Sequence, residues 1–446
     1  MSYTAIVTRL KDVRPHSNAD KVQLATCHGN QVVIGLDSKE SEWGVYFPCD
    51  GQLSDEFCKA NNLYRDNTKN KNTEAKPGMF DDNRRVRAQK FRGEISDGFW
   101  VPLHYFAFIE ITGLDVEGYE FDTWRGVPIC NKYVNPATVK AAKENQPKKV
   151  RKAKTSEMFF EHIDTKHMIV NIDKIEPNDL IIITSKQHGT SGRVGHVLID
   201  RKLTTIEKIA KFFGAKIKEK DWSFLNGTRR VVIEESSGTQ FHDPTIRDKA
   251  FNLFKDNLRK GETVYFEIVG YESLGRPIMG MVDTTKIGDK NFTKLYSNAG
   301  DNKHMIFKYG CADGQSDVFV YRMTMTNEDG KMVDYSWDDV KRRCSEIGVK
   351  HSPELDRFTV NEFKLRHNIT DDRDFNDKFI EYVNQVSDGA DPTDSTHWSE
   401  GSCIRLESGL AVRIFKHKNF NFKVLEGIIK DSGFIDEEEA QSEVIN

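Results

Sequence analysis

The stretch Ile181-Ile182-Ile183-Thr184-Ser185-Lys186-Gln187-His188-Gly189-Thr190-Ser191 is an apolar strand pattern that runs into a glycine-containing turn. Because the end of a strand holds a side chain in one direction, Lys186 is placed to act as a nucleophile. Gly189 lets the following backbone approach a phosphate, and the apolar run offers a poorly hydrated wall. The Lys-x-x-Gly pattern alone is weak, since about one or two matches are expected by chance in such a chain.

Five further segments follow Lys186 in a characteristic order: TRRVVI at 228–233, VYFEIVG at 264–270, DVFVYRM at 317–323, EGSCIR at 400–405 and KHK at 416–418. This order resembles the collinear motifs of the covalent nucleotidyltransferases, which comprise ATP-dependent RNA ligases, DNA ligases and mRNA capping enzymes. The segments KQHGTS at 186–191 and Lys-x-Lys at 416–418 are most similar to those of RNA ligases. The architecture resembles the RNA ligase family in which an OB domain precedes the ligase domain, over residues from about 3 to about 430.

Length and composition indicate a globular protein of two or three domains. The chain has 446 residues, of which 30% are charged and 37% hydrophobic, and it contains no apolar run long enough to span a bilayer. The start MSYTA lacks the basic and apolar regions of a secretory signal, which predicts a cytoplasmic location. The seven cysteines are scattered without a C-x-x-C pair, so they are interpreted as reduced thiols rather than disulfides or a zinc site.

Charge is distributed unevenly along the chain. The net charge of −4 argues against non-specific binding to nucleic acid, but residues 139–154 contain seven lysines and arginines against Glu144 alone. This run is either a solvated linker or a strip that contacts phosphates. The chain ends in an acidic tail, which begins at about residue 434.

The first 125 residues are predicted to form a small β-barrel. Short strand-like runs alternate with Gly, Asn and Asp, and two segments, 15–21 and 92–98, resemble OB domains, which bind oligonucleotides on one face. Arginine, lysine and aromatic residues between 84 and 100 form either a nucleic-acid-binding strip or an ordinary amphipathic strand pair. We expect an OB-like domain over 1–125, a basic linker over 126–155, a nucleotidyltransferase domain over 156–433 and a tail over 434–446.

The C-terminal region alternates strand and helix patterns, which predicts an α+β fold of antiparallel sheets with a nucleotide between them. Helices are expected at 204–218, at 244–259, from Ser336, and at 373–386. A hairpin around residues 407–409 should bring Glu400 and Lys416 into one neighbourhood. The chain has no GxxxxGK[ST], HExxH or GxGxxG motif, which argues against P-loop, zincin and Rossmann proteins.

Nucleophilic chemistry at Lys186 would require a neutral amine. Lysine has an ordinary pKa near ~10.4, so the site is expected to lower the pKa of Lys186 by burial and by nearby positive charge. Lys416, Lys418 and Arg229 could supply that charge, together with a divalent metal. On a strand, positions 416 and 418 point the same way, so two cations would face one phosphate. A pair of solvated surface lysines would give the same sequence pattern.

The resemblance implies roles for further residues. Glu267 would bind the ATP ribose and approach the metal, and Glu400 would hold Mg²⁺ (or Mn²⁺). Tyr321 would stack on adenine, with Phe319 as the alternative on the same strand. Glu267 could instead face water on an ordinary strand, and the aromatic residues could instead belong to the core.

Arg229 corresponds to a phosphate-directed arginine of the family, although Arg230 and Arg193 compete for that role. Two positions depart from the pattern. His188 stands where DNA ligases and capping enzymes carry Asp, and Arg322 stands where relatives often carry an acidic residue.

The sequence therefore predicts an ATP-dependent RNA ligase that seals RNA 5′-phosphate and 3′-hydroxyl ends as a monomer. Its candidate catalytic residues are Lys186, Lys416 and Lys418. The same three lysines would bind the nucleotide with Gly189, Arg229, Glu267 and Tyr321, and Glu400 and Glu267 would bind the metal. The alternatives are a DNA ligase or capping enzyme, which usually carry an OB domain after the Lys-x-Lys motif, where about 28 residues remain here, or a non-catalytic RNA-binding protein.

Overall fold

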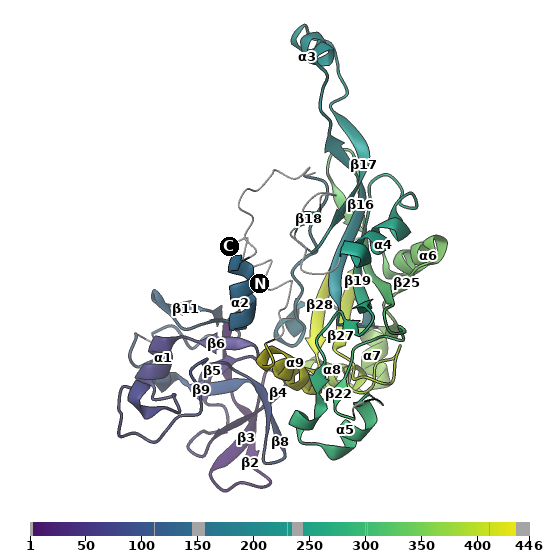
Figure 1. Cartoon of the computed structure of the whole chain (residues 1–446). Helices are drawn as coiled ribbons and strands as arrows, with labels where there is room; N and C mark the ends of the chain where they lie inside the picture. Colours follow the sequence, from purple (N-terminus) through teal and green to yellow (C-terminus); the bar gives the residue numbers. More distant parts are fainter. Residues whose placement is uncertain are drawn as a thin grey trace.

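The protein is described here by a computed structural model that covers residues 3–110, 112–144, 157–229, 231–233, 244–298, 300, 302–409 and 411–433. The acidic tail, Arg230 and most of the basic run from 145 onward lie outside the described residues. The fold is mixed α+β (Figure 1). The N-terminal strands, drawn in purple and blue, lie beside a larger C-terminal part drawn in teal to yellow.

The N-terminal part consists of small antiparallel sheets. A four-stranded sheet has the order β10-β1-β5-β9 and a three-stranded sheet the order β2-β3-β4, and three further strand pairs are β13-β6, β7-β8 and β11-β12. The bounds are β1 Ala5–Arg9, β2 Lys11–Pro15, β3 Val22–Cys27, β4 Asn30–Gly35, β5 Trp43–Phe47, β6 Gly51–Leu53, β7 Ala88–Phe91, β8 Glu94–Asp97, β9 Phe99–Pro102, β10 Glu120–Phe121, β11 Thr123–Trp124, β12 Val127–Pro128 and β13 Cys130–Lys132. Helices α1 (Asp55–Ala60) and α2 (Pro136–Glu144) accompany them. Since β13 pairs with β6, strand pairing with this part continues past residue 125.

The C-terminal part contains two large sheets. A five-stranded sheet has the order β14-β28-β27-β15-β26, and an eight-stranded sheet follows β18-β17-β16-β19-β23-β24 with β20 and β25 at its sides. Their bounds are β14 Lys166–His167, β15 Leu180–Ser185, β16 Thr190–Asp200, β17 Lys220–Gly227, β18 Val232–Ile233, β19 Glu262–Ser273, β20 Arg276–Pro277, β23 Ser316–Thr326, β24 Met332–Asp334, β25 Lys350–His351, β26 Glu354–Thr359, β27 Gly401–Ser408 and β28 Ala411–Lys418. The pairings are antiparallel except β14 with β28 and β23 with β25. A short pair, β21 (Val282–Asp283) with β22 (His304–Met305), forms a separate two-stranded sheet, and its Val282 and Met305 are buried in the core that joins the two large sheets.

All four helices expected from the sequence are present, and the first two end earlier than expected. The helices of the C-terminal part are α3 Thr205–Phe212, α4 Pro244–Phe254, α5 Lys290–Tyr296, α6 Trp337–Ile347, α7 Val360–Arg366, α8 Asp372–Ser387 and α9 Phe420–Asp431. Helix α3 ends well before residue 218, because Gly214 adopts a left-handed φ of +86° and stops it. The Ser336 side chain caps α6 by accepting a hydrogen bond from the Asp339 N–H. The strands β16 and β17 project from the body as a hairpin that carries α3 at its tip (Figure 1).

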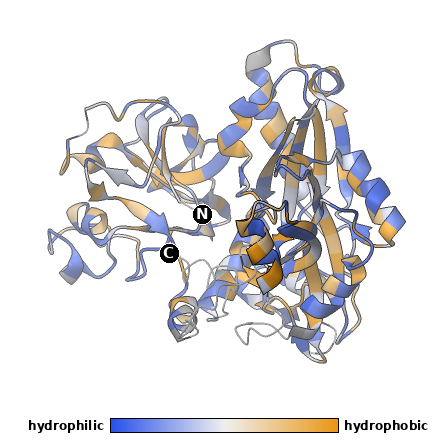
Figure 2. Cartoon of the chain, turned by 90° about the horizontal axis from the view of Figure 1, so that it is seen from above, coloured by the Kyte–Doolittle hydropathy of each residue, from blue (hydrophilic) through white to orange (hydrophobic). Residues whose placement is uncertain are grey.

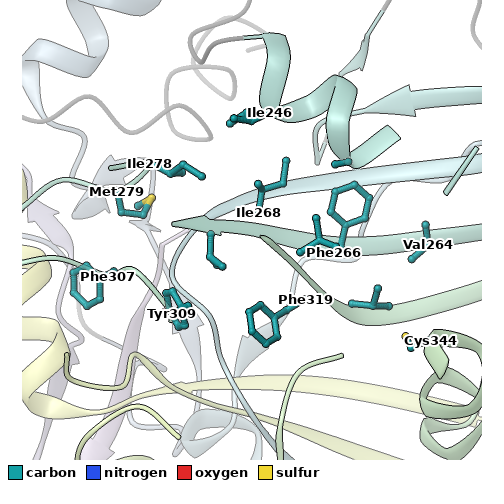
Figure 3. Packing of buried hydrophobic residues seen from close by; sticks show 14 of the residues in the cluster. Ile246, Val264, Phe266, Ile268, Ile278, Met279, Phe307, Tyr309, Phe319 and Cys344 are labelled. Carbon is teal, nitrogen blue, oxygen red and sulfur yellow. The ribbon is translucent and has the colours of Figure 1, made fainter. Parts of the chain in front are cut away.

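One hydrophobic core joins the two large sheets to α9. Hydrophobic residues are frequent along the strands of the C-terminal part, and hydrophilic residues are frequent on the outer helices (Figure 2). Phe266 of β19, Phe319 of β23 and Tyr309 pack together in this core (Figure 3), which also contains Ile182 of β15 and Phe422 of α9. Burial of this apolar surface fixes the segment after β15 against both sheets. Among the described residues, none of the helices is both long and apolar enough to cross a membrane.

Candidate functional site

Lys186 lies in the short segment that crosses from the five-stranded sheet to the eight-stranded sheet. It follows β15, whose residue Ser185 is paired with Ser402 of β27, and its backbone N–H donates to the Gly401 carbonyl over 3.0 Å. Gly401 in turn is paired with Lys418 of β28. The register therefore brings the nucleophile segment, the Glu-Gly segment and the Lys-x-Lys segment to one edge of the sheet.

Gly401 is required by this arrangement. Its φ of +141° is one that L side chains rarely adopt, and a Cβ added there would lie 2.1 Å from the His417 carbonyl oxygen. The close approach of β27 and β28 at this point places the Glu400 side chain beside Lys186.

Lys186 forms an ion pair with Glu400, with 2.8 Å between Nζ and Oε1. The Lys186 side chain is 26% exposed and that of Glu400 only 2%. Burial by itself would lower the pKa of Lys186, but the negative charge of Glu400, with Cys403 and Glu267 adding to it, outweighs burial and raises this pKa. The expectation of a lowered pKa is therefore wrong for this structure, because the nearest group to the amine is a carboxylate rather than a cation.

Glu400 is a candidate metal ligand on the grounds of its own environment. Its Oε1 also lies 3.8 Å from Lys418 Nζ, whereas its buried Oε2 accepts no hydrogen bond from the part of the chain that the structure describes. Within the same part, no group of three or more His, Cys, Asp and Glu side chains could enclose a metal ion. A site with one or two carboxylates suits Mg²⁺, which keeps several waters and binds substrate phosphates for its other ligands.

His188 lies between Glu400 and two aromatic side chains of the hydrophobic core. Its Nδ1 lies 3.9 Å from Glu400 Oε2, and its ring meets the rings of Phe307 and Phe422 edge to face, at 4.9 Å in each case. Burial in this surrounding lowers the pKa of His188 to about 4, in spite of the nearby Glu400. His188 is therefore neutral at physiological pH, which distinguishes it from the Asp of DNA ligases.

Lys416 and Lys418 lie on the same strand but in different electrostatic environments. Burial, followed by the positive charges of Lys418, Lys186, Arg229 and Lys132, lowers the pKa of Lys416 to about 7. Repulsion of this kind arises only where several cations converge, and an anionic phosphate placed among them would relieve it.

Lys418 is held by a carboxylate. Its Nζ donates to both oxygens of Glu426 of α9, at 2.9 and 2.8 Å. Burial would lower the pKa of Lys418, but Glu426 and Glu400 outweigh it and raise this pKa, so Lys418 keeps its charge. Glu426 was not predicted from the sequence. No sequence pattern indicates that a glutamate in α9 pairs with Lys418 at the end of β28.

Lys132 was also missed. It belongs to β13 of the N-terminal part and contributes to the lowered pKa of Lys416, so its ammonium group lies within electrostatic reach of the Lys-x-Lys segment. Lys132 falls within the segment that the sequence indicates as a basic linker, and a lysine in such a segment does not indicate a place in the site.

Glu267 is half-buried on β19 and accepts a hydrogen bond from Ser191 Oγ over 3.0 Å. It does not simply face water. Its charge contributes to the raised pKa of Lys186, so it borders the same site. A Cβ on Gly189 would lie 2.2 Å from the Ile268 carbonyl oxygen and 3.0 Å from Glu267 Cγ. The packing of the turn against β19 therefore requires glycine, independently of any approach to a phosphate.

Tyr321 and Phe319 have different surroundings although both belong to β23. The pairing of β23 with β19 shifts register beside Tyr321, and the Tyr321 ring meets the His162 ring edge to face at 5.0 Å. Phe319 is buried in the hydrophobic core (Figure 3). Of the two side chains, Tyr321 is half-buried and Phe319 is buried. The departure at Arg322 has a structural reason, since its guanidinium pairs with Asp334 over 2.5 Å.

The three arginines considered for phosphate binding also have different surroundings. Arg229 pairs with Asp164 over 2.8 Å and acts electrostatically on Lys416, so it borders the site. Arg193 is buried with its guanidinium over the Phe159 ring, 4.4 Å from the centroid. Arg230 lies outside the described residues.

The basic and aromatic stretch from 84 to 100 is largely engaged within the protein. Arg85 is buried and pairs with Asp50 and Asp431, Arg87 also pairs with Asp431, and the Trp100 side chain belongs to the core. Exposed residues in this stretch include Lys90, Phe91 and Arg92. The nucleic-acid-binding strip expected here is thus narrower than its composition suggests.

Comparison with solved structures shows a chain-length likeness to a Naegleria gruberi RNA ligase. The apo form of a variant matches with a TM-score of 0.56 and 15% identity, over 95% of this chain and 97% of that chain. A variant with ATP and Mn matches with a TM-score of 0.55 and 15% identity, over 95% and 98%, and one with AMP and Mn with 0.55 and 15%, over 94% and 97%. The fold is that of this RNA ligase. No protein-family model and no curated protein matches the sequence.

Proposed function

We propose that this protein is an ATP-dependent RNA ligase that works through a lysyl-AMP intermediate. The observation that carries the proposal is the convergence of Lys186, Glu400, Lys416 and Lys418 at one edge of the sheet, in a fold shared with an RNA ligase. An isolated amine beside a carboxylate is a common ion pair. An amine that shares its site with several further cations is suited to a polyphosphate.

In the first step, Lys186 Nζ loses a proton and attacks the α-phosphorus of ATP. A P–N bond forms, the bond from that phosphorus to the bridging oxygen breaks, and pyrophosphate leaves. The AMP group then passes to a 5′-phosphate of RNA, which releases the lysine. A 3′-hydroxyl finally attacks the adenylylated phosphate, displaces AMP and forms the phosphodiester.

The surrounding cations bind and orient the phosphates. Lys418, kept charged by Glu426, and Lys416 and Arg229 are proposed to contact the phosphates of the nucleotide. Chemistry of this kind depends on positioning and on fixed charge where negative charge develops. Because the pKa of Lys416 is lowered to about 7 in the free protein, part of the Lys416 side chains are neutral near pH 7 and can take up a proton when phosphate binds.

We propose that Glu400 and Glu267 hold a divalent cation, Mg²⁺ or Mn²⁺. The buried and unbonded Oε2 of Glu400 fits such a ligand. A bound cation would supply positive charge beside the Lys186 amine and the α-phosphate.

The nucleoside is proposed to lie between the two sheets. Tyr321 would stack on adenine, Glu267 would accept a hydrogen bond from the ribose, and the segment at Gly189 would border the phosphate. Support for these roles comes from the family resemblance, and for Glu267 and Gly189 also from the charge of Glu267 acting on Lys186 and the packing of Gly189 against Glu267.

The N-terminal part is proposed to be the OB-like nucleic-acid-binding domain, with β13 included in it. Residues 156–433 would form the ligase domain, preceded by a basic linker and followed by the acidic tail. We expect the protein to act as a monomer on RNA, including nicks in a duplex.

The test is strand sealing by the full-length protein. A 5′-phosphorylated nick in an RNA duplex should be joined with ATP and Mg²⁺ or Mn²⁺, and Lys186→Ala should abolish joining. Sealing restricted to DNA, or covalent labelling by GTP in place of ATP, would favour a DNA ligase or a capping enzyme. Binding of RNA without any covalent labelling would favour a non-catalytic protein.

A further inference from the structure

An unbroken chain of alternating charges runs from the N-terminal part to Lys186. Asp50 contacts Lys430 over 3.3 Å, and Lys430 contacts Glu426 over 3.6 Å. Glu426 binds Lys418 over 2.8 Å. Lys418 lies 3.8 Å from Glu400, which binds Lys186 over 2.8 Å.

The middle of this chain is buried. Lys430, Glu426 and Glu400 are each 9% exposed or less. A buried charge is tolerated only with a partner, and loss of one member leaves its neighbour uncompensated. The six side chains therefore depend on one another for their charges and positions, unlike ion pairs at the surface.

Helix α9 carries the central members and is also the docking surface for the N-terminal part (Figure 1). Arg85 and Arg87 pair with Asp431 at its end, over 3.2 and 2.9 Å. Lys423, at its start, pairs with Asp97 of β8 over 2.5 Å. The helix begins directly after Lys418, since Asn419 is its N-cap.

We propose that Glu426 and Lys430 are positioning residues for the transfer of AMP to Lys186, and that they make this step depend on docking of the N-terminal part. The inference rests on the proposed function. Glu426 holds the Lys418 ammonium near Glu400 and the phosphates. Lys430 holds Glu426 and joins it to Asp50, so the position of Lys418 depends on a residue that is more than three hundred positions away in sequence.

Lys423 provides a matched control. Lys423 and Lys430 both lie on α9, and both pair with an N-terminal carboxylate. Of the two, Lys430 is the one that also contacts Glu426. Lys423→Met and Lys430→Met therefore each remove one docking ion pair, but Lys430→Met also breaks the chain.

The experiment measures covalent labelling of the full-length protein by ATP in single turnovers over a range of ATP concentrations. Wild-type labelling must be established first, and its absence would refute the proposed function rather than this inference. For Lys430→Met and Glu426→Gln we expect kcat/KM for labelling to fall by at least about tenfold, since Lys430→Met removes a partner of the buried Glu426 and Glu426→Gln removes the nearest partner of Lys418. For Lys423→Met we expect a loss below about threefold, because its partner Asp97, although buried, does not belong to the chain of contacts that ends at Lys186.

Two comparisons separate positioning from folding. Glu426→Asp keeps the charge and should recover a large part of the rate that Glu426→Gln loses, and thermal unfolding will show whether each variant is folded. If Lys430→Met does not fold, Glu426→Gln against Glu426→Asp decides. Equal losses in Lys430→Met and Lys423→Met, or equal rates for Glu426→Gln and Glu426→Asp, would overturn the proposal.

Discussion

Lys186 has the Glu400 carboxylate as its nearest charged neighbour, and this contact is the largest of the influences that raise the pKa of Lys186. The sequence predicted a cluster of cations around Lys186, and the structure has that cluster, but centred on Lys416. The pKa of Lys186 is raised and that of Lys416 is lowered to about 7. The same site thus keeps Lys186 as a cation, whereas Lys416 changes its charge near pH 7.

The first prediction concerns Glu400. In Glu400→Gln the carboxylate that raises the pKa of Lys186 is gone while burial remains, so this pKa should fall. NMR titration of ¹³C-methylated lysines in the free protein measures it directly. Glu354→Gln, which removes the partner of Lys341 instead, should leave the Lys186 signal unchanged. An unaltered pKa of Lys186 in Glu400→Gln would contradict the assignment.

The second prediction concerns the pH dependence of ATP binding. Because the pKa of Lys416 is about 7 in the free protein, its charge is present below pH 7 and is lost as the pH rises above 7. Affinity for ATP should therefore decline above pH 7, by at most about tenfold for each pH unit. Binding near pH 7.5 should take up protons, which calorimetry in buffers of different ionisation enthalpy detects. Lys416→Met should bind ATP more weakly at pH 6.5 and lose the proton uptake. An affinity of the wild type for ATP that does not change with pH would contradict a pKa near 7 for Lys416.

At the scale of elements, the strands around the site were the most predictable features. The apolar run of β15 and the hairpin of β27 and β28 are encoded locally, by hydrophobic pattern and turn residues. Helix α9 was not predicted, although Phe422, Leu425 and Ile429 repeat at helical spacing and are buried. Gly427 in its middle lowers helix propensity by about 1 kcal/mol, and burial against the core offsets this cost.

Gly427→Ala should therefore stabilise the protein. The nearest atom to an added Cβ is Arg85 Nη2 at 3.7 Å, an ordinary contact, so α9 gains propensity without a clash. We expect the free energy of unfolding to rise by about 0.5–1 kcal/mol, measured by denaturant titration. A decrease would show that the helix needs glycine there for packing.

Gly401→Ala should have the opposite effect. The added Cβ would meet the His417 carbonyl at 2.1 Å, and the φ of +141° is strained for alanine. We expect a destabilisation of about 1–3 kcal/mol and a loss of ATP labelling, because β27 and β28 must separate where Glu400 and Lys418 meet. Gly409→Ala is the control in the same hairpin, because its φ of +60° is also strained for alanine whereas its Cβ would contact nothing within 4 Å. Normal labelling by Gly401→Ala would show that this close approach is not needed.

At the scale of the whole molecule, the sequence did not indicate how the N-terminal part docks on the C-terminal part. Arg85 and Asp431 are separated by 346 positions, and Lys132 reaches the Lys416 environment from a segment interpreted as a linker. Such pairings form only in the assembled fold, so no local sequence pattern predicts them. The composition of the 84–100 stretch suggested a surface that binds RNA, because composition does not show which charges are paired within the protein. In the structure, Arg85 and Arg87 form ion pairs with Asp431 of α9.

The central claim is that Lys186 carries AMP. The full-length protein should be incubated with α-labelled ATP and Mg²⁺ or Mn²⁺, denatured, digested and mapped by peptide mass spectrometry. The account predicts one AMP per chain, on the peptide that contains Lys186, and no label in Lys186→Ala. Label on Lys416 or Lys418, or a Lys186→Ala variant that is labelled as fully as the wild type, would contradict it.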